Sequence, residues 1–202
     1  MIKTVIFDLG NVIVPFDFGR GYRAMAEHCP YSAEEIRGRL GATDLVHRFE
    51  SGQVPARDFY NEVSGILHST AGYEKFCAIW SSVFFPVTLI PEAMLEGLKK
   101  RVRLLLLSNT NEIHFAMIRR EYALMRHFDD FVLSHIVGAM KPSPLIYETA
   151  IAKSQCDPGE CFFTDDVLPY VEAARAMGID AVQFESAEQI ERELRARGVD
   201  WD

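Results

Sequence analysis

The sequence lacks the features of several specialised protein classes. Its longest apolar runs, such as residues 104–107, are far shorter than the roughly 20 residues of a transmembrane helix. Acidic residues outnumber basic ones by 29 to 21, and the formal net charge of −8 disfavours nucleic acid as a partner, because a phosphate backbone requires a basic surface. None of the four cysteines has CxxC spacing, which favours reduced core thiols over disulfides or a zinc site: Cys29, Cys77, Cys156 and Cys161.

Nucleotide-binding and export signals are also missing. No strand pattern is followed by G-x-G-x-x-G, and no P-loop sequence occurs, which disfavours dinucleotide-binding enzymes and P-loop NTPases. The start lacks the basic segment, the apolar segment and the cleavage site of a signal peptide, so we expect a cytoplasmic protein with no membrane partner. The 202 residues, 49% of them hydrophobic, suffice for one sizeable core and an insertion.

The first informative stretch runs from Thr4 to Val14 and reads TVIFDLGNVIV. An apolar strand pattern ends at Asp8, and Gly10 and Asn11 follow as turn residues. Ligands of open parallel sheets bind outside the carboxyl ends of the strands, so this pattern places Asp8 at the mouth of a site. The alternative is that Asp8 only caps the turn.

Residues 16–87 have helical periodicity, and four turn signals divide them into four or five short helices. This pattern predicts a small helical bundle whose aromatic residues mostly pack, with Phe16 and Phe18 as candidates for lining a pocket. After residue 87, short apolar strands alternate with helices of about ten residues. Strands are expected at 102–107, 131–133, 161–163 and 181–184, and Ser186 with Gln189 predicts a capping box for the last helix.

These patterns predict an α/β protein built on a doubly wound parallel sheet. Residues 1–15 and 88–202 would form the α/β core. Residues 16–87, called the cap region below, would form a helical cap inserted after the first strand.

Polar residues follow three of the expected strands and one loop, and they should meet at one rim of the sheet. Hard oxygen ligands from such carboxylates suit Mg²⁺, which also removes their mutual repulsion. A hydroxyl, an amide and a lysine in a loop stiffened by two prolines suit the oxygens of a phosphate ester. The residues are Asp8, then Ser108 and Asn109, then Lys141, then Asp165 and Asp166.

In order along the chain, FDLGNV, LSNTN, MKP and FTDD resemble the four motifs of the haloacid dehalogenase superfamily. The resemblance covers essentially the whole chain, and it is strongest to small capped phosphatases such as glucose-1-phosphate phosphatase and the N-terminal domain of soluble epoxide hydrolase. It implies a Rossmann-like core with a helical cap. It also implies a Mg²⁺-dependent phosphatase acting on a small phosphorylated metabolite.

The resemblance further implies roles for individual residues. Asp8 would be the nucleophile that forms an aspartyl-phosphate, and Lys141 would assist it as a catalytic residue. Ser108, Asn109 and Lys141 would bind the phosphoryl oxygens. The metal ligands would be Asp8, the backbone carbonyl of Gly10, Asp165 and Asp166.

The chain departs from the superfamily pattern at two places. Most of the phosphatases carry an acid-base Asp two residues after the nucleophile, where this chain has Gly10. We expect the loss of that group to slow the hydrolysis of esters with poor leaving groups by about 10²- to 10⁴-fold. Relatives also have Asp or Asn shortly after the last motif, where this chain has Pro169 and Tyr170. His114 is the only histidine near the motifs, and we interpret it as a packing or surface residue.

Three alternatives remain open from sequence. A 2-haloacid dehalogenase uses the same Asp nucleophile without a metal, although the Asp165–Asp166 pair counts against it. A phosphomutase is a weaker option. A non-catalytic phosphate-binding or regulatory protein is favoured by Gly10 and Tyr170. The sequence does not identify the substrate, and it is compatible with a monomer or a homodimer.

Overall fold

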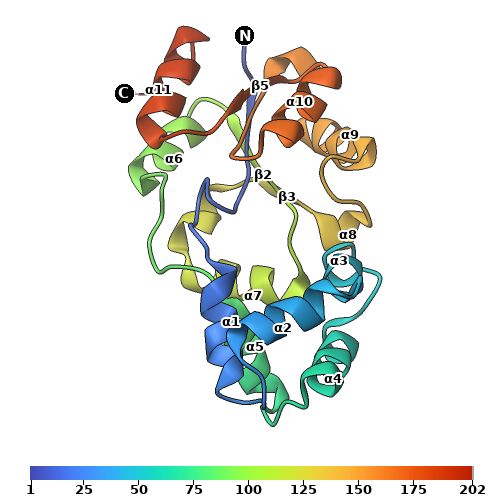
Figure 1. The fold of residues 1–202 in the computed structure, drawn as a ribbon. Coiled ribbons are helices and arrows are strands. Elements are labelled where there is room, and N and C mark those ends of the chain that lie inside the picture. Colours follow the sequence, from blue (N-terminus) through green and yellow to red (C-terminus); the bar gives the residue numbers. More distant parts are fainter. Residues whose placement is uncertain (202) are drawn as a thin grey trace.

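The computed structural model describes residues 1–201, and a five-stranded parallel sheet lies at its centre (Figure 1). The strands are β1 (Thr4–Phe7), β2 (Arg103–Ser108), β3 (Asp130–Leu133), β4 (Cys161–Asp165) and β5 (Asp180–Gln183). Their order across the sheet is β3-β2-β1-β4-β5, and every pair is parallel. This confirms the predicted α/β class and places β1 in the middle of the sheet.

Alternate residues of the strands enter two separate apolar cores, because successive side chains of a strand point to opposite faces. Phe7 packs into the core beneath α6 (Glu92–Lys99), α7 (Glu112–Glu121) and α11 (Ala187–Ala196). Its neighbour Ile6 packs into the core beneath α9 (Pro144–Ser154) and α10 (Leu168–Ala176). Helices therefore cover both faces of the sheet, which explains why its strands read as continuous apolar runs.

The cap region contains α1 (Phe18–Ala26), α2 (Ala33–Gly41), α3 (Leu45–Glu50), α4 (Ala56–Leu67) and α5 (Tyr73–Ser81). These helices gather below the sheet in Figure 1, on the side toward which the strands run. They have their own core, in which the rings of Phe49 and Phe59 stack with centroids 4.0 Å apart. Ile113 of α7 joins that core, so the cap region packs directly against the sheet domain.

The remaining elements are the 3-10 helices η1 (Ala123–His127) and η2 (Pro158–Glu160) and the four-residue helix α8 (Ser134–Val137). The sequence does not predict α8, which is too short to show periodicity. The predicted capping box of α11 forms only in part: Ser186 Oγ accepts from the backbone N–H of Gln189, but the Gln189 side chain accepts from Glu185 instead of Ser186. Among residues 1–201, no helix is long and apolar enough to cross a bilayer.

Candidate active site

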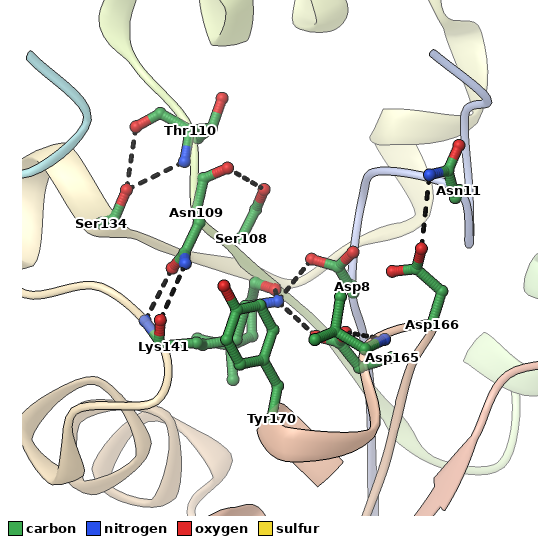
Figure 2. Close-up of polar contacts among 12 residues, drawn as sticks. Asp8, Asn11, Ser108, Asn109, Thr110, Ser134, Lys141, Asp165, Asp166 and Tyr170 are labelled. Carbon is green, nitrogen blue, oxygen red and sulfur yellow. Dashed lines mark hydrogen bonds and ion pairs between the residues drawn. The ribbon is translucent and has the colours of Figure 1, made fainter. Parts of the chain in front are cut away.

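Polar side chains from four chain segments converge at the carboxyl end of the sheet (Figure 2). Asp8 directly follows β1, Ser108 is the last residue of β2, Lys141 lies in the loop before α9, and Asp165 is the last residue of β4. Because β1 pairs with both β2 and β4, these strand ends are neighbours. The structure thus brings together the residues that the sequence pattern assigns to one rim.

Lys141 is the centre of this cluster. Its side-chain nitrogen Nζ lies 2.6 Å from Asp8 Oδ1 and 2.5 Å from Asp165 Oδ2, and the residue is only 3% exposed. The ring of Tyr170 lies 5.2 Å from Nζ and covers it, as Figure 2 shows. Burial acts to lower the pKa of Lys141, but the two carboxylates outweigh it and raise the pKa above its usual value. The ammonium therefore stays charged while Asp8 is ionised.

Burial acts on Asp8 in the opposite sense. Removal from water raises its pKa from 3.8 to about 7, and this effect outweighs the lowering by the Lys141 charge. A positive charge brought to the site would favour the ionised, nucleophilic form of Asp8, because opposite charges stabilise each other most strongly where water is excluded.

Asn109 fixes the backbone from which Lys141 extends. Its side-chain carbonyl accepts a hydrogen bond of 2.7 Å from the Lys141 N–H, and its amide donates one of 3.0 Å to the Lys141 carbonyl. The carbonyl oxygen and one of the two amide N–H groups of Asn109 are thereby used within the protein, which leaves the second N–H available to a ligand. Ser108 donates only a long hydrogen bond of 3.4 Å, to the Asn109 carbonyl, so its hydroxyl can turn toward a ligand.

Three carboxylates form a cluster that fits a metal ion. Asp8, Asp165 and Asp166 each offer an oxygen, and these atoms lie within 4.8 Å of one another. Asp165 is completely buried, whereas Asp166 is half-buried and accepts a 3.3 Å hydrogen bond from the Asn11 amide. Burial raises the pKa of Asp166, and the hydrogen bond from Asn11 opposes that rise. Hard oxygen donors of this kind suit Mg²⁺, which would also offset the repulsion among them.

Gly10 contributes to the same site through its backbone. Among residues 1–201, no hydrogen bond ends on its carbonyl oxygen, which leaves that oxygen available to a cation. A Cβ atom on Gly10 would lie 2.7 Å from the ring of Phe16. The aromatic ring therefore fills the space in which the acid-base Asp of related phosphatases would begin.

His114 has a structural role, in agreement with our interpretation of the sequence. It is buried, its Nε2 lies 2.9 Å from the carbonyl oxygen of Trp80, and its Nδ1 lies 3.1 Å from the amide of Asn111. Since a carbonyl can only accept, Nε2 carries the proton and Nδ1 accepts from Asn111. Burial lowers the pKa of His114 from 6.5 to about 4, so the ring is neutral and both nitrogens are occupied.

Sequence reasoning missed the residues that connect this rim to the cap region. The Ser134 hydroxyl accepts a 2.9 Å hydrogen bond from the Thr110 N–H, and it lies 2.6 Å from the carbonyl oxygen of Glu50 in the cap region. Thr110 has a buried hydroxyl with no hydrogen-bond partner in the described chain. The position of Thr110 just after LSN was the only available signal, whereas nothing in the sequence marks Ser134 or Glu50.

Comparison with known proteins agrees with this geometry. A D-ribitol-5-phosphate phosphatase from Bacteroides thetaiotaomicron is 26% identical over 200 residues, covering 96% of this chain and 97% of the relative. The structure of a haloacid dehalogenase family enzyme from the same species, in complex with magnesium and inorganic phosphate, superposes with a TM-score of 0.79 at 23% identity and covers 92% of this chain and 96% of its own.

The fold alone does not choose between phosphatase and dehalogenase chemistry. An L-2-haloacid dehalogenase superposes with a TM-score of 0.71 at 18% identity, covering 97% of this chain and 100% of its own. The family model of the haloacid dehalogenase-like hydrolases matches residues 2–178, which include every residue of the cluster described above. The chain therefore belongs to the haloacid dehalogenase-like hydrolases.

Proposed function

We propose that this protein is a Mg²⁺-dependent phosphatase that hydrolyses a small phosphorylated metabolite through an aspartyl-phosphate on Asp8. The observation that carries the proposal is the carboxylate cluster with Lys141 at its centre: three carboxylate oxygens within 4.8 Å, one of them on the candidate nucleophile. A dehalogenase needs no such cluster, whereas phosphoryl transfer depends on charge neutralisation and positioning. The D-ribitol-5-phosphate phosphatase activity of a relative supports the same reaction class.

The residues of the rim have distinct tasks in this proposal. Asp8 attacks phosphorus, and Lys141 holds one of its oxygens in place while stabilising negative charge on the phosphoryl group. Ser108, the ammonium of Lys141 and the second amide N–H of Asn109 bind phosphoryl oxygens, and Asn109 also fixes the Lys141 backbone. Asp8, Asp165, Asp166 and the Gly10 carbonyl would hold Mg²⁺, which when bound neutralises the carboxylates and polarises the phosphoryl group.

The overall organisation proposed from sequence is retained in this proposal. Residues 16–87 act as the cap, and residues 1–15 and 88–202 as the hydrolase core. Aromatic side chains of the cap region, Phe16 and Phe18 among them, line the space above the strand ends. The proposed protein is a cytoplasmic monomer or homodimer that takes a small sugar or polyol phosphate, and the similarity to a D-ribitol-5-phosphate phosphatase supports this substrate class.

Release of inorganic phosphate from p-nitrophenyl phosphate and from a panel of sugar, polyol, nucleotide and acyl phosphates tests the proposal. We expect turnover in Mg²⁺, its loss in excess EDTA, and its return when Mg²⁺ is restored. Asp8→Asn should abolish turnover without changing the circular dichroism spectrum, whereas Asp58→Asn, an exposed aspartate of α4, should leave it unchanged. Mg²⁺ and phosphate binding without turnover would instead identify a binding protein, and chloride release from 2-chloropropionate a dehalogenase.

A further inference from the structure

A small, partly open pocket lies between the cap region and the strand ends. Its volume is about 50 Å³, enough for a few water molecules, and it is lined on the sheet side by Gly10, Ser108 and Asn109. The cap region contributes Phe16 and Glu50 to its wall. Glu50 is therefore an acidic residue in the wall of the space beside the proposed phosphoryl site.

The backbone of Glu50 is held firmly against the core. Its carbonyl oxygen lies 2.6 Å from the Ser134 hydroxyl, which also bonds to Thr110 next to the Ser108–Asn109 pair. Two residues later, Gly52 has a φ of +73°, and a Cβ there would lie 2.0 Å from the carbonyl oxygen of His135. Only glycine permits this close approach of the cap region to α8, and the approach fixes the position of the Glu50 backbone.

The Glu50 carboxyl group has no partner within the protein. Among residues 1–201, no hydrogen bond or ion pair involves its side-chain oxygens. Burial raises its pKa from 4.5 to about 7, and the titratable side chain that it affects in turn is Tyr22 of α1. A carboxyl group in this state is protonated in a large fraction of molecules near neutral pH, as a proton donor for catalysis has to be.

The absence of a side chain at Gly10 means that a proton donor for the leaving group has to come from another residue. The position that usually supplies the acid carries no side chain, and the Phe16 ring occupies the space next to it. Phe16, Gly10 and Glu50 line the same pocket. An acid delivered from the cap region would reach the leaving group from the side opposite the sheet.

We propose that Glu50 is the general acid and base of this enzyme, in place of the Asp that is missing at residue 10. The inference rests on the proposed phosphatase function. As Asp8 forms its bond to phosphorus, the ester P–O bond breaks and its electron pair stays on the leaving oxygen, which takes the Glu50 proton. In the second step water attacks phosphorus, its proton returns to the Glu50 carboxylate, and the Asp8 carboxylate is released.

The proposal predicts that Glu50→Gln damages catalysis in proportion to the basicity of the leaving group. Three substrates separate the possibilities when kcat/KM is measured, since kcat/KM reports steps up to leaving-group departure. D-ribitol 5-phosphate releases a strongly basic alkoxide, phenyl phosphate releases a phenolate of intermediate basicity, and p-nitrophenyl phosphate releases a phenolate that needs no proton. We expect a loss of about 10²- to 10⁴-fold for the first, a smaller loss for the second and little change for the third.

Two further variants complete the experiment. Glu50→Asp keeps the acid and should recover part of the lost rate, whereas Glu34→Gln, at an exposed carboxylate of α2, should have no effect on any substrate. Equal loss for both aryl esters, with a raised KM for the polyol phosphate, would show that Glu50 binds substrate hydroxyls and would overturn the proposal. Equal loss for all three substrates, or no loss, would also overturn it. Absence of turnover by the unmodified protein would reject the phosphatase function itself.

Discussion

Replacing Lys141 by methionine should destabilise the protein severely. The ammonium is almost fully buried and contacts one oxygen each of Asp8 and Asp165. Methionine has a similar shape but no charge, so the variant leaves two buried carboxylates facing each other. Removing one partner of a buried ion pair costs about 3–5 kcal/mol. At roughly 2–4 °C per kcal/mol for a protein of this size, the melting temperature should fall by about 6–20 °C.

The free energy of unfolding, measured by urea denaturation in EDTA, tests this prediction. Lys153→Met is the matched control, because Lys153 pairs with Asp130 at 2.8 Å but both side chains are more than a third exposed. An exposed pair contributes about 0–1 kcal/mol, so this control should be nearly as stable as the unmodified protein. A Lys141→Met variant that is no less stable than Lys153→Met would refute the electrostatic account of the site.

A second substitution and added Mg²⁺ identify the origin of the lost stability. Asp165→Asn in the Lys141→Met background should recover stability, because it removes one of the two facing carboxylates. The double variant should then be more stable than the sum of the single effects predicts, as is usual for residues in direct contact. Excess Mg²⁺ should also recover part of the loss if the carboxylates hold the cation as proposed.

Two other predictions concern Gly10 and His114. Gly10→Asp should lower the free energy of unfolding by about 1–3 kcal/mol, because the new Cβ meets the Phe16 ring at 2.7 Å. Phe16→Ala should reduce that loss in a double-mutant cycle. A Gly10→Asp variant as stable as the unmodified protein would contradict the steric account. The buried His114 binds fewer protons in the folded state, so it favours folding fully above about pH 6.5 and progressively less as the pH falls toward 4. Between pH 7 and pH 5 its contribution to the free energy of unfolding should fall by about 2 kcal/mol. Urea titrations at the two pH values should show that His114→Gln lacks this difference. The control His47→Gln, at an exposed histidine, should retain it.

The sheet and its rim could be predicted from sequence because burial on both faces leaves a clear signal. Residues such as Leu104 to Leu107 must all be apolar, and the first polar residue after each run marks the strand end. In β4 this rule placed the end too early. The strand continues through Asp165, which pairs with Gln183 of β5 and is polar but completely buried. Its Lys141 partner makes such burial tolerable, and that partner is 24 residues away in sequence.

The tasks of individual polar side chains were less predictable, because they depend on tertiary contacts. Asn109 follows a strand and has the chemistry of a phosphate ligand, and its side chain also holds the Lys141 backbone through two hydrogen bonds that the sequence does not indicate. Tyr170 lies where related proteins carry an acidic or amide residue, and it covers the Lys141 ammonium with its ring. Neither contact leaves a periodicity or a spacing in the sequence, since each joins segments that are distant along the chain.

Glu50 shows most clearly what sequence could not supply. The chain has 29 acidic residues, and the missing acid at Gly10 raises the question of which of them could replace it. Other carboxylates of the cap region already have partners or solvent: Glu35 caps α2, and Glu62 lies 3.8 Å from Arg48. Glu50 differs because its turn docks on α8 through Gly52, a contact between segments 84 residues apart. This docking places Glu50 in the wall of the pocket beside Gly10 and Ser108, and no hydrogen bond or ion pair among residues 1–201 involves its carboxyl group. Under the proposal made for Glu50, the proton donor missing beside the nucleophile is supplied by packing of the cap region, without a sequence motif that marks the exchange.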